Sequence, residues 1–139
     1  MPLIPRRGLL AITAVVDVAL HADRRLLSAK TLANSYRLAP RHLEPLMQAL
    51  VHANILRGIR GPRGGYTLAR PTHEITLYQI LTAALPDSEE DDYALGHHPI
   101  VKDVVLPTIA TADRAMAQAL NSISVAVLVA KASHHYSDN

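Results

Sequence analysis

Side chains that suit contact with a polyanion gather at two places in the first half of the sequence. Arg41, His42 and Glu44 stand at the start of the stretch 40–54, whose apolar residues fall on the opposite side of a helix. The second place is the turn GPRGG at residues 61–65, which contains Arg63 and directly follows Arg60. A guanidinium group binds phosphate or guanine, and a carboxylate accepts a hydrogen bond from the cytosine amino group. This chemistry predicts contact with double-stranded DNA through Lys30, Arg41, His42, Glu44, Arg60, Pro62 and Arg63.

The distribution of charge supports a polyanionic partner for the first half alone. The whole chain of 139 residues carries a formal net charge of +2. Residues 1–70 hold 11 Arg and Lys side chains against three acidic ones, a net charge of +8. Residues 71–139 hold three against nine, a net charge of −6. A uniformly solvated surface does not usually separate its charges in this way, so we expect the basic half to bind the polyanion.

Three helices are predicted to position the first group of residues. Apolar residues recur at helical spacing in residues 8–22, 29–36 and 40–54. Ser28 is a good N-cap for the second helix, and Pro40 suits the first position of the third. The charged residues therefore stand at the N-terminal end of the third helix, the end that a recognition helix directs to base edges.

A β-hairpin is predicted to carry the second group. Short strands at about 55–59 and 66–68 flank the GPRGG turn. Two short helices joined by a tight turn and followed by a hairpin make a winged helix-turn-helix. The expected fold is mainly α with a small β-hairpin wing and a long C-terminal dimerisation helix. In such a fold the helix enters the major groove of DNA, and the hairpin tip brings an arginine to the minor groove.

The second half of the chain is predicted to connect and to dimerise. A helix at 77–85 precedes the acidic stretch 87–99, and a long helix begins at about residue 101 or 107. SVAVLVAKA could be a strand by propensity, but its position after a long helix favours a further short helix, and we expect a polar tail from His134. The predicted units are a winged helix-turn-helix DNA-binding domain at 1–85, an acidic connector loop at 86–99, dimerisation helices at 100–133 and a tail at 134–139.

An apolar stripe on the long helix predicts contact between two copies of the chain. Ile109, Ala112, Met116 and Leu120 recur at helical spacing, and Ile123 extends the stripe. The same residues could instead form a core within one chain. A long helix beyond a small winged domain favours the dimer.

Composition excludes several classes of protein. The chain contains no cysteine, which removes disulfides, thiolate zinc sites and cysteine-ligated clusters. No run reaches 18 apolar residues, and Asp17 interrupts the apolar run near the start, so we expect neither a membrane span nor a signal peptide. No nucleophile–base pair or phosphate loop has supporting context, so we expect no catalytic residues and no enzyme activity. These features favour a cytoplasmic protein without a membrane partner.

Several segments resemble the IscR/NsrR/BadM-type family of bacterial winged helix-turn-helix regulators. LVHANILRGIRGPRGGYTLA resembles the wing of that family, and SAKTLANSYRLAPRHLEPLMQAL resembles its helix-turn-helix. RRGLLAITAVVDVALHA is similar to its first helix, HEITLYQILTA to the helix after the wing and ALNSISVAVLV to the close of its dimerisation helix. The resemblance implies a homodimeric transcriptional regulator, a repressor, that binds a partly palindromic operator. It also implies that Arg41, His42 and Glu44 read the operator from the recognition helix, and that Arg60, Pro62 and Arg63 contact it from the wing.

The sequence departs from this family at one place. Many members hold an iron–sulfur cluster through three cysteines just before the dimerisation helix, and this chain has none. Asp91, His97 and Asp103 fall near the positions of those cysteines and are the candidates for a metal site with oxygen and nitrogen ligands. A solvated acidic loop explains the same residues more simply. We therefore expect no cofactor and leave open whether a metal or a small-molecule effector binds.

A second interpretation of the whole chain stays open. A winged helix can serve as a module that binds a protein or a small ligand and no longer binds operator DNA. Salt-dependent retention on DNA separates this alternative from the regulator. At single residues, Glu44 could be a structural partner of Arg41 or Lys30, and Arg6 and Arg7 could contact phosphate or form a disordered start.

Overall fold

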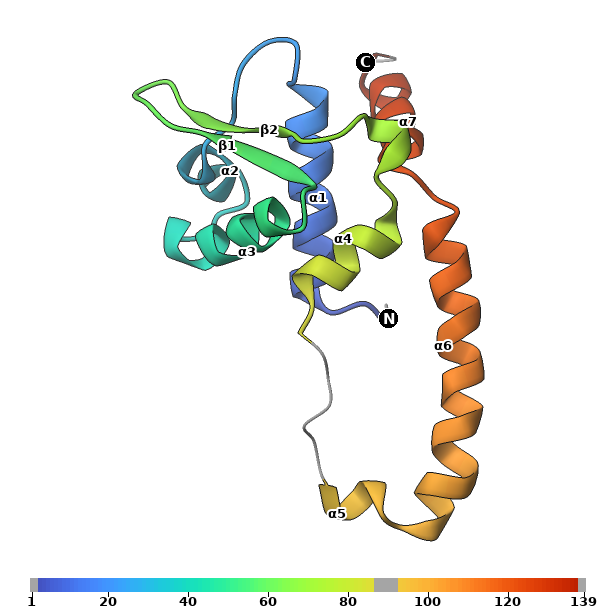
Figure 1. Cartoon of the computed structure of the whole chain (residues 1–139). Coiled ribbons are helices and arrows are strands. Elements are labelled where there is room, and N and C mark those ends of the chain that lie inside the picture. Colours follow the sequence, from blue (N-terminus) through green and yellow to red (C-terminus); the bar gives the residue numbers. More distant parts are fainter. Residues whose placement is uncertain (1–2, 87–92, 138–139) are drawn as a thin grey trace.

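The computed structural model describes residues 3–86 and 93–137 (Figure 1). The predicted fold, mainly helical with a small hairpin, is confirmed, and β1 and β2 form a two-stranded antiparallel sheet. In chain order the elements are α1 (Arg6–Leu20), α2 (Ala29–Ser35), α3 (Pro40–His52), β1 (Leu56–Ile59), β2 (Gly65–Leu68), the 3₁₀ turn η1 (Thr72–Glu74), α4 (Leu77–Ala84), α5 (Tyr93–Gly96), the π-helical turn η2 (Val101–Val105), α6 (Leu106–Asn121) and α7 (Val125–Ser137).

The core of the winged domain surrounds α1, with α3, α4 and α7 packed around it (Figure 1). Leu32 of α2, Leu43 and Leu50 of α3, Ile80 of α4 and Val125 of α7 are each 2% exposed or less. Fully burying a side chain of this size stabilises a fold by roughly 1.5–3 kcal/mol relative to leaving it exposed. The core therefore holds the apolar face of α3 and leaves the opposite face of that helix exposed to solvent.

The helix starts follow the capping residues. The Ser28 hydroxyl accepts a hydrogen bond from the Thr31 backbone N–H at 3.1 Å, and Pro40 occupies the first turn of α3. Thr76 and Gln79 form a capping box at the start of α4. The Ser28, Thr76 and Gln79 side chains satisfy backbone donors that a helix start leaves without a partner. The predicted cap at Ser28 and the predicted position of Pro40 at the start of the third helix are confirmed.

The hairpin is closed by residues 60–64 and lies against the segment that joins α1 to α2. Ile59 pairs with Gly65 at its turn end, and Gly61 has φ +124°, a conformation that favours glycine. The Tyr66 backbone N–H donates to the Leu27 carbonyl at 2.9 Å. A Cβ atom on Gly65 would lie only 2.7 Å from that carbonyl oxygen, so glycine permits the close approach.

The turn between α6 and α7 is tied to the start of α4. Leu77 N–H donates to the Ile123 carbonyl at 3.0 Å, and Val125 N–H donates to the Ile75 carbonyl at 2.8 Å. α7 then runs beside α1, while the far end of α6 extends away from the winged domain (Figure 1). α7 therefore belongs to the packing of the winged domain, whereas α6 projects from it with η2 and α5 at its far end (Figure 1).

The second half of the chain differs from prediction in detail. The polar tail expected from His134 is instead the last turn of α7, which continues to Ser137. No glycine or proline interrupts residues 125–137, so nothing in the sequence stops the helical hydrogen bonds. Helix α5 lies inside the predicted connector loop 86–99, of which residues 87–92 lie outside the described residues.

A hydrogen bond ties the helix-turn-helix to α1. The Tyr36 hydroxyl donates to a carboxylate oxygen of Asp17 at 2.5 Å. Tyr36 directly follows α2, and the turn is closed by the Leu38 N–H, which donates to the Ala33 carbonyl at 2.8 Å. Burial raises the pKa of the Tyr36 hydroxyl well above its ordinary value, and the hydrogen bond and charge of Asp17 raise it further. A neutral phenol therefore holds the turn between α2 and α3 against α1.

Tyr36→Phe should lower the free energy of unfolding at neutral pH by about 1–3 kcal/mol, because the half-buried Asp17 carboxylate loses its donor. A pKa raised in the folded chain gives stabilisation that is present below about pH 10 and is lost as the pH rises further. The substitution should therefore also reduce the loss of stability above pH 10. Thermal unfolding of both proteins between pH 7 and 11 measures the difference, and parallel curves would contradict this role.

Candidate nucleic-acid interface

One face of α3 is open to solvent and carries the residues predicted to read DNA. Arg41, His42 and Glu44 are exposed, whereas Leu43 and Leu46 beside them are buried. Glu44 forms no ion pair with Arg41 or with the exposed Lys30 in the described part of the chain. Its carboxylate is therefore available to accept a hydrogen bond from a base.

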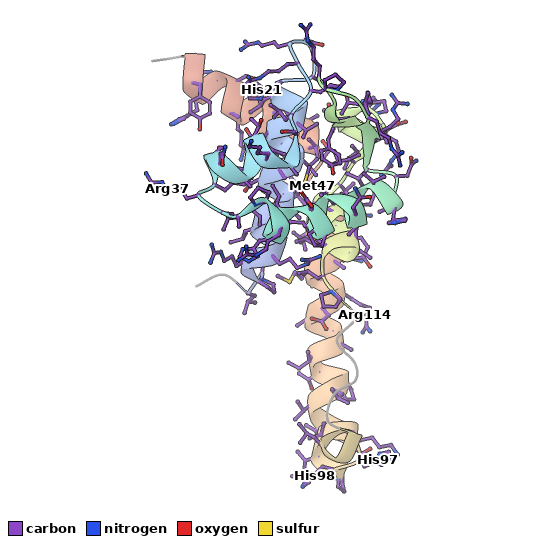
Figure 2. The ribbon with its side chains drawn as sticks, turned by 90° about the vertical axis from the view of Figure 1, so that its left-hand side faces the viewer. His21, Arg37, Met47, His97, His98 and Arg114 are labelled. Atoms are coloured by element: carbon purple, nitrogen blue, oxygen red, sulfur yellow. The ribbon has the colours of Figure 1, made fainter. Side chains whose placement is uncertain are left out.

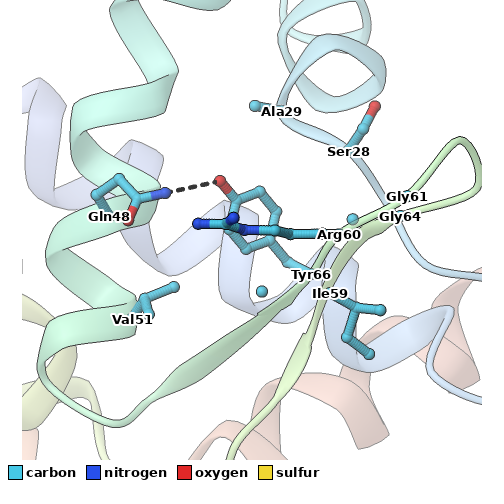
Figure 3. A pocket seen from close by; sticks show the side chains of 11 residues that line it. Ser28, Ala29, Gln48, Val51, Ile59, Arg60, Gly61, Gly64 and Tyr66 are labelled. Atoms are coloured by element: carbon cyan, nitrogen blue, oxygen red, sulfur yellow. Dashed lines mark hydrogen bonds between the residues drawn. The ribbon is translucent and has the colours of Figure 1, made fainter.

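The hairpin and α3 enclose a hollow of about 480 Å³, which the start of α2 also borders. The Gln48 side-chain amide donates to the Tyr66 hydroxyl at 3.4 Å across it. The Arg60 side chain extends over Tyr66 toward Gln48 (Figure 3). The hollow thus brings a guanidinium, an amide and a phenol together between the helix and the wing, and all three can donate hydrogen bonds to phosphate.

Sequence reasoning did not identify Gln48 and Tyr66 as part of this site. Gln48 stands four residues after Glu44, so it shares the exposed face of α3, and helical spacing alone could have indicated it. Tyr66 gave no such signal, because its contact with Gln48 depends on how the hairpin folds back onto α3.

A second hollow borders the hairpin on the side of the α1–α2 segment. Its lining includes Pro62 and Arg63 from the tip and two arginines that sequence reasoning did not select, Arg24 and Arg25. All three arginines are exposed. The two arginines predicted as wing contacts, Arg60 and Arg63, therefore line different hollows.

Two other arginines of the basic half hold the fold together. Arg7 Nε donates to the Ala84 carbonyl at the end of α4 at 2.6 Å, which assigns this side chain a structural role. The guanidinium of Arg70 donates to the Asn54 carbonyl, the Glu74 carbonyl and the Gln79 side chain, at 3.0, 2.9 and 3.1 Å. Arg6 lines a smaller hollow beside His42. Part of the +8 charge therefore supports the winged domain instead of facing a ligand.

The candidate metal ligands are not brought together in the described residues. Asp91 lies outside those residues, and His97 and Asp103 are exposed near the far end of α6. Over residues 3–86 and 93–137, no group of three or more His, Asp or Glu side chains has the arrangement of a metal site. The geometry gives no support to a metal at these positions.

The predicted stripe on α6 divides into an exposed part and a part packed on its own chain. Ile109 is 50% exposed, and Ala112 is exposed as well. Met116 and Leu120 line a hollow against α4, and Leu120 and Ile123 pack against the core. The exposed apolar surface continues through Leu106 at the start of α6 to Val104 and Val105 of η2.

Comparison with known proteins identifies this arrangement. The family model Rrf2, described as "Iron-dependent Transcriptional regulator", matches residues 4–131. BadM of Rhodopseudomonas palustris, described as an HTH-type transcriptional regulator, is 33% identical over 101 residues, which cover 66% of this chain and 63% of BadM. The chain therefore aligns with less than two thirds of the length of the curated relatives it matches.

Solved structures show the same fold over most of the chain. IscR from T. potens superposes with a TM-score of 0.73 at 26% identity, covering 93% of this chain and 87% of that one. CymR, the global cysteine regulator of B. subtilis, gives a TM-score of 0.69 at 25% identity, covering 94% and 98%. Among the described helices of this chain, none is long and apolar enough to cross a membrane.

Proposed function

Because the chain belongs to the Rrf2 family of winged helix-turn-helix transcriptional regulators, we propose that it binds a specific, partly palindromic operator as a homodimer and represses transcription there. The family consists of regulators, not of enzymes. The residues that we assign to operator contact are Lys30, Arg41, His42, Glu44, Gln48, Arg60, Pro62, Arg63 and Tyr66.

The observation that carries this proposal is the hollow between α3 and the hairpin. If α3 lies in the major groove and the hairpin reaches the adjacent minor groove, the sugar–phosphate strand between the grooves must cross that hollow. Gln48, Arg60 and Tyr66 line it and can donate to the phosphates of that strand. Such contacts fix the position of the protein, while the exposed start of α3 reads the base edges.

A second copy of the chain is the partner that we propose for α6. The exposed stripe contains large apolar side chains such as Ile109 and the small Ala112, which lets two helices approach closely. A two-fold symmetric dimer presents two recognition helices and two wings, and a partly palindromic operator has the matching symmetry. The projection of α6 from the winged domain leaves its surface accessible to that copy (Figure 1).

A cysteine-ligated iron–sulfur cluster does not fit this chain. The sequence contains no thiolate ligand, and the described His, Asp and Glu side chains form no group that replaces one. We therefore assign no step of operator binding to a cluster. Asp91, His97 and Asp103 are not proposed as a metal site.

Genomic footprinting with the purified chain tests the proposed function, because the bound promoters identify the operator. If the dimer neutralises about four to eight phosphates, the logarithm of the affinity should fall with the logarithm of salt concentration at a slope near −4 to −7. A flat salt response, or equal affinity for every duplex of a genomic library, would contradict the proposal. That result would favour a winged domain that binds a protein or a small ligand instead.

A further inference from the structure

The segment between α1 and α2 carries two arginines that the proposed operator contacts do not use. Arg24 and Arg25 are exposed, and their backbone N–H groups donate to the His21 carbonyl at 2.9 and 3.0 Å. These hydrogen bonds close a turn at the end of α1, at the top of the molecule in Figure 1. The turn therefore presents two consecutive exposed arginines from a defined backbone.

The wing and this turn form one unit. Leu27 is 4% exposed and fixes the end of the turn in the core, and its carbonyl accepts the Tyr66 N–H from β2. Gly65 permits that contact, since a Cβ atom there would lie 2.7 Å from the Leu27 carbonyl. A hydrogen-bonded bridge so close to the hairpin tip keeps the two arginines of the turn beside Arg63.

The three arginines line one open hollow of about 540 Å³. No carboxylate belongs to its lining, although Asp23 precedes Arg24 in the turn. None of the three guanidinium groups has an ion-pair partner in the described part of the chain. The complete lining is Arg24, Arg25, Leu26, Ser28, Thr31, Pro62, Arg63 and Gly64.

We infer that the α1–α2 turn, together with Arg63, is a second DNA-contact surface that binds the phosphate backbone of the duplex flanking each half-site, beyond the strand that crosses the first hollow. This inference rests on the proposed function and assigns it an additional partner surface. Arginine binds phosphate through two parallel hydrogen bonds, and an open surface of three arginines matches a continuous duplex backbone better than an enclosed anion. The contact is to phosphates, so it adds affinity and orientation without reading sequence.

The test compares two duplexes of different length and three double variants of the full chain. The short duplex ends at the bases protected by α3 and the hairpin tip, and the long one adds about one helical turn, roughly 10 base pairs, of unrelated sequence at each end. The wild-type chain should bind the long duplex more tightly. Arg24→Gln/Arg25→Gln should lose that gain, about tenfold or more at moderate salt, and should leave binding to the short duplex nearly unchanged. Since a dimer carries four of these arginines, the salt slope on the long duplex should also become shallower, by up to about 3 to 4.

Lys102→Gln/Arg114→Gln is the matched control, because it removes the same charge from the region of η2 and α6, away from the wing (Figure 2). Sedimentation checks that all three double variants keep the oligomeric state of the wild type. Arg24→Lys/Arg25→Lys should keep most of the salt slope, since the charge is retained.

Two results with Arg24→Gln/Arg25→Gln would overturn the inference: the variant still binds the long duplex more tightly than the short one, or it loses affinity equally for both duplexes. A third is that the control variant loses as much affinity for the long duplex as Arg24→Gln/Arg25→Gln does. Failure of the wild type to bind any operator duplex would instead contradict the proposed function itself.

Discussion

Ile109→Asp should convert the protein to monomers without unfolding it. Ile109 is 50% exposed in the single chain, so a carboxylate at this position is solvated in the monomer. In the proposed dimer the same carboxylate would be buried without a partner, which costs several kcal/mol. A cost of about 4 kcal/mol weakens self-association roughly a thousandfold. Ile109 is a sharper test than Met116, because Met116 also lines the hollow against α4 of its own chain.

Loss of the dimer should also weaken operator binding. Two linked recognition helices bind the second half-site as an intramolecular event, and separate protomers lose that effective concentration. Gln118→Asp is the matched control, since Gln118 is exposed on α6 and lies about 180° around the helix from Ile109. Sedimentation at micromolar concentration and operator titration measure both effects. If Ile109→Asp remains a dimer, the dimer interface does not include Ile109. If the variant is a monomer with undiminished operator affinity, one protomer is sufficient for operator binding.

The winged domain could be predicted from the sequence because its determinants are local. Ser28 and Pro40 act on the first turns that follow them, and the glycines at 61, 64 and 65 close the hairpin within a few residues. Local sequence also predicts that Leu43 and Leu46 lie on the opposite face of α3 from its charged residues, because helical periodicity alone assigns residues to faces.

Contacts between distant segments could not be predicted in this way. The pairing of Leu27 with Tyr66 joins a loop to a strand nearly 40 residues later, and only that pairing places Arg24 and Arg25 beside the wing. Arg7 and Arg70 belong to the basic half by sequence, yet carbonyl groups that only the folded chain brings near accept their hydrogen bonds. A count of charges therefore overstates the number of cations that face a ligand.

The C-terminal helices show a related limit. SVAVLVAKA was correctly predicted to be helical from its position after a long helix, although its valines favour a strand by propensity. That α7 returns to α1 and buries Val125 depends instead on backbone hydrogen bonds from the α6–α7 region to Ile75 and Leu77. Residues 120 and 123 therefore pack on the core of their own chain, although their spacing on the stripe is the same as that of residues 109 and 112.

Arg60→Ala should lower operator affinity by about 5- to 150-fold for each protomer that loses its contact, the effect of losing one good arginine contact of about 1–3 kcal/mol. The Arg60 side chain lines the hollow beside Tyr66 (Figure 3), which the strand between the two grooves would cross in the proposed complex. The loss should be greatest on operators with a narrow minor groove, because such grooves concentrate negative potential. Arg57→Ala is the matched control, since Arg57 is an exposed arginine of β1 outside the residues that line the hollow.

Glu44→Ala should change base preference instead of lowering affinity. The contrast with Arg60→Ala distinguishes a contact that supplies affinity from one that recognises a base. A carboxylate near phosphates is repulsive, so its removal should hold or raise the affinity for mixed DNA. Base preference should relax at one position in each half-site, where the cytosine amino group loses its acceptor. Selection of bound duplexes from a random library, carried out with both variants, measures preference and affinity together. An unchanged preferred sequence for Glu44→Ala would make Glu44 structural, and a changed preference under α3 for Arg60→Ala would show that the wing also positions the recognition helix.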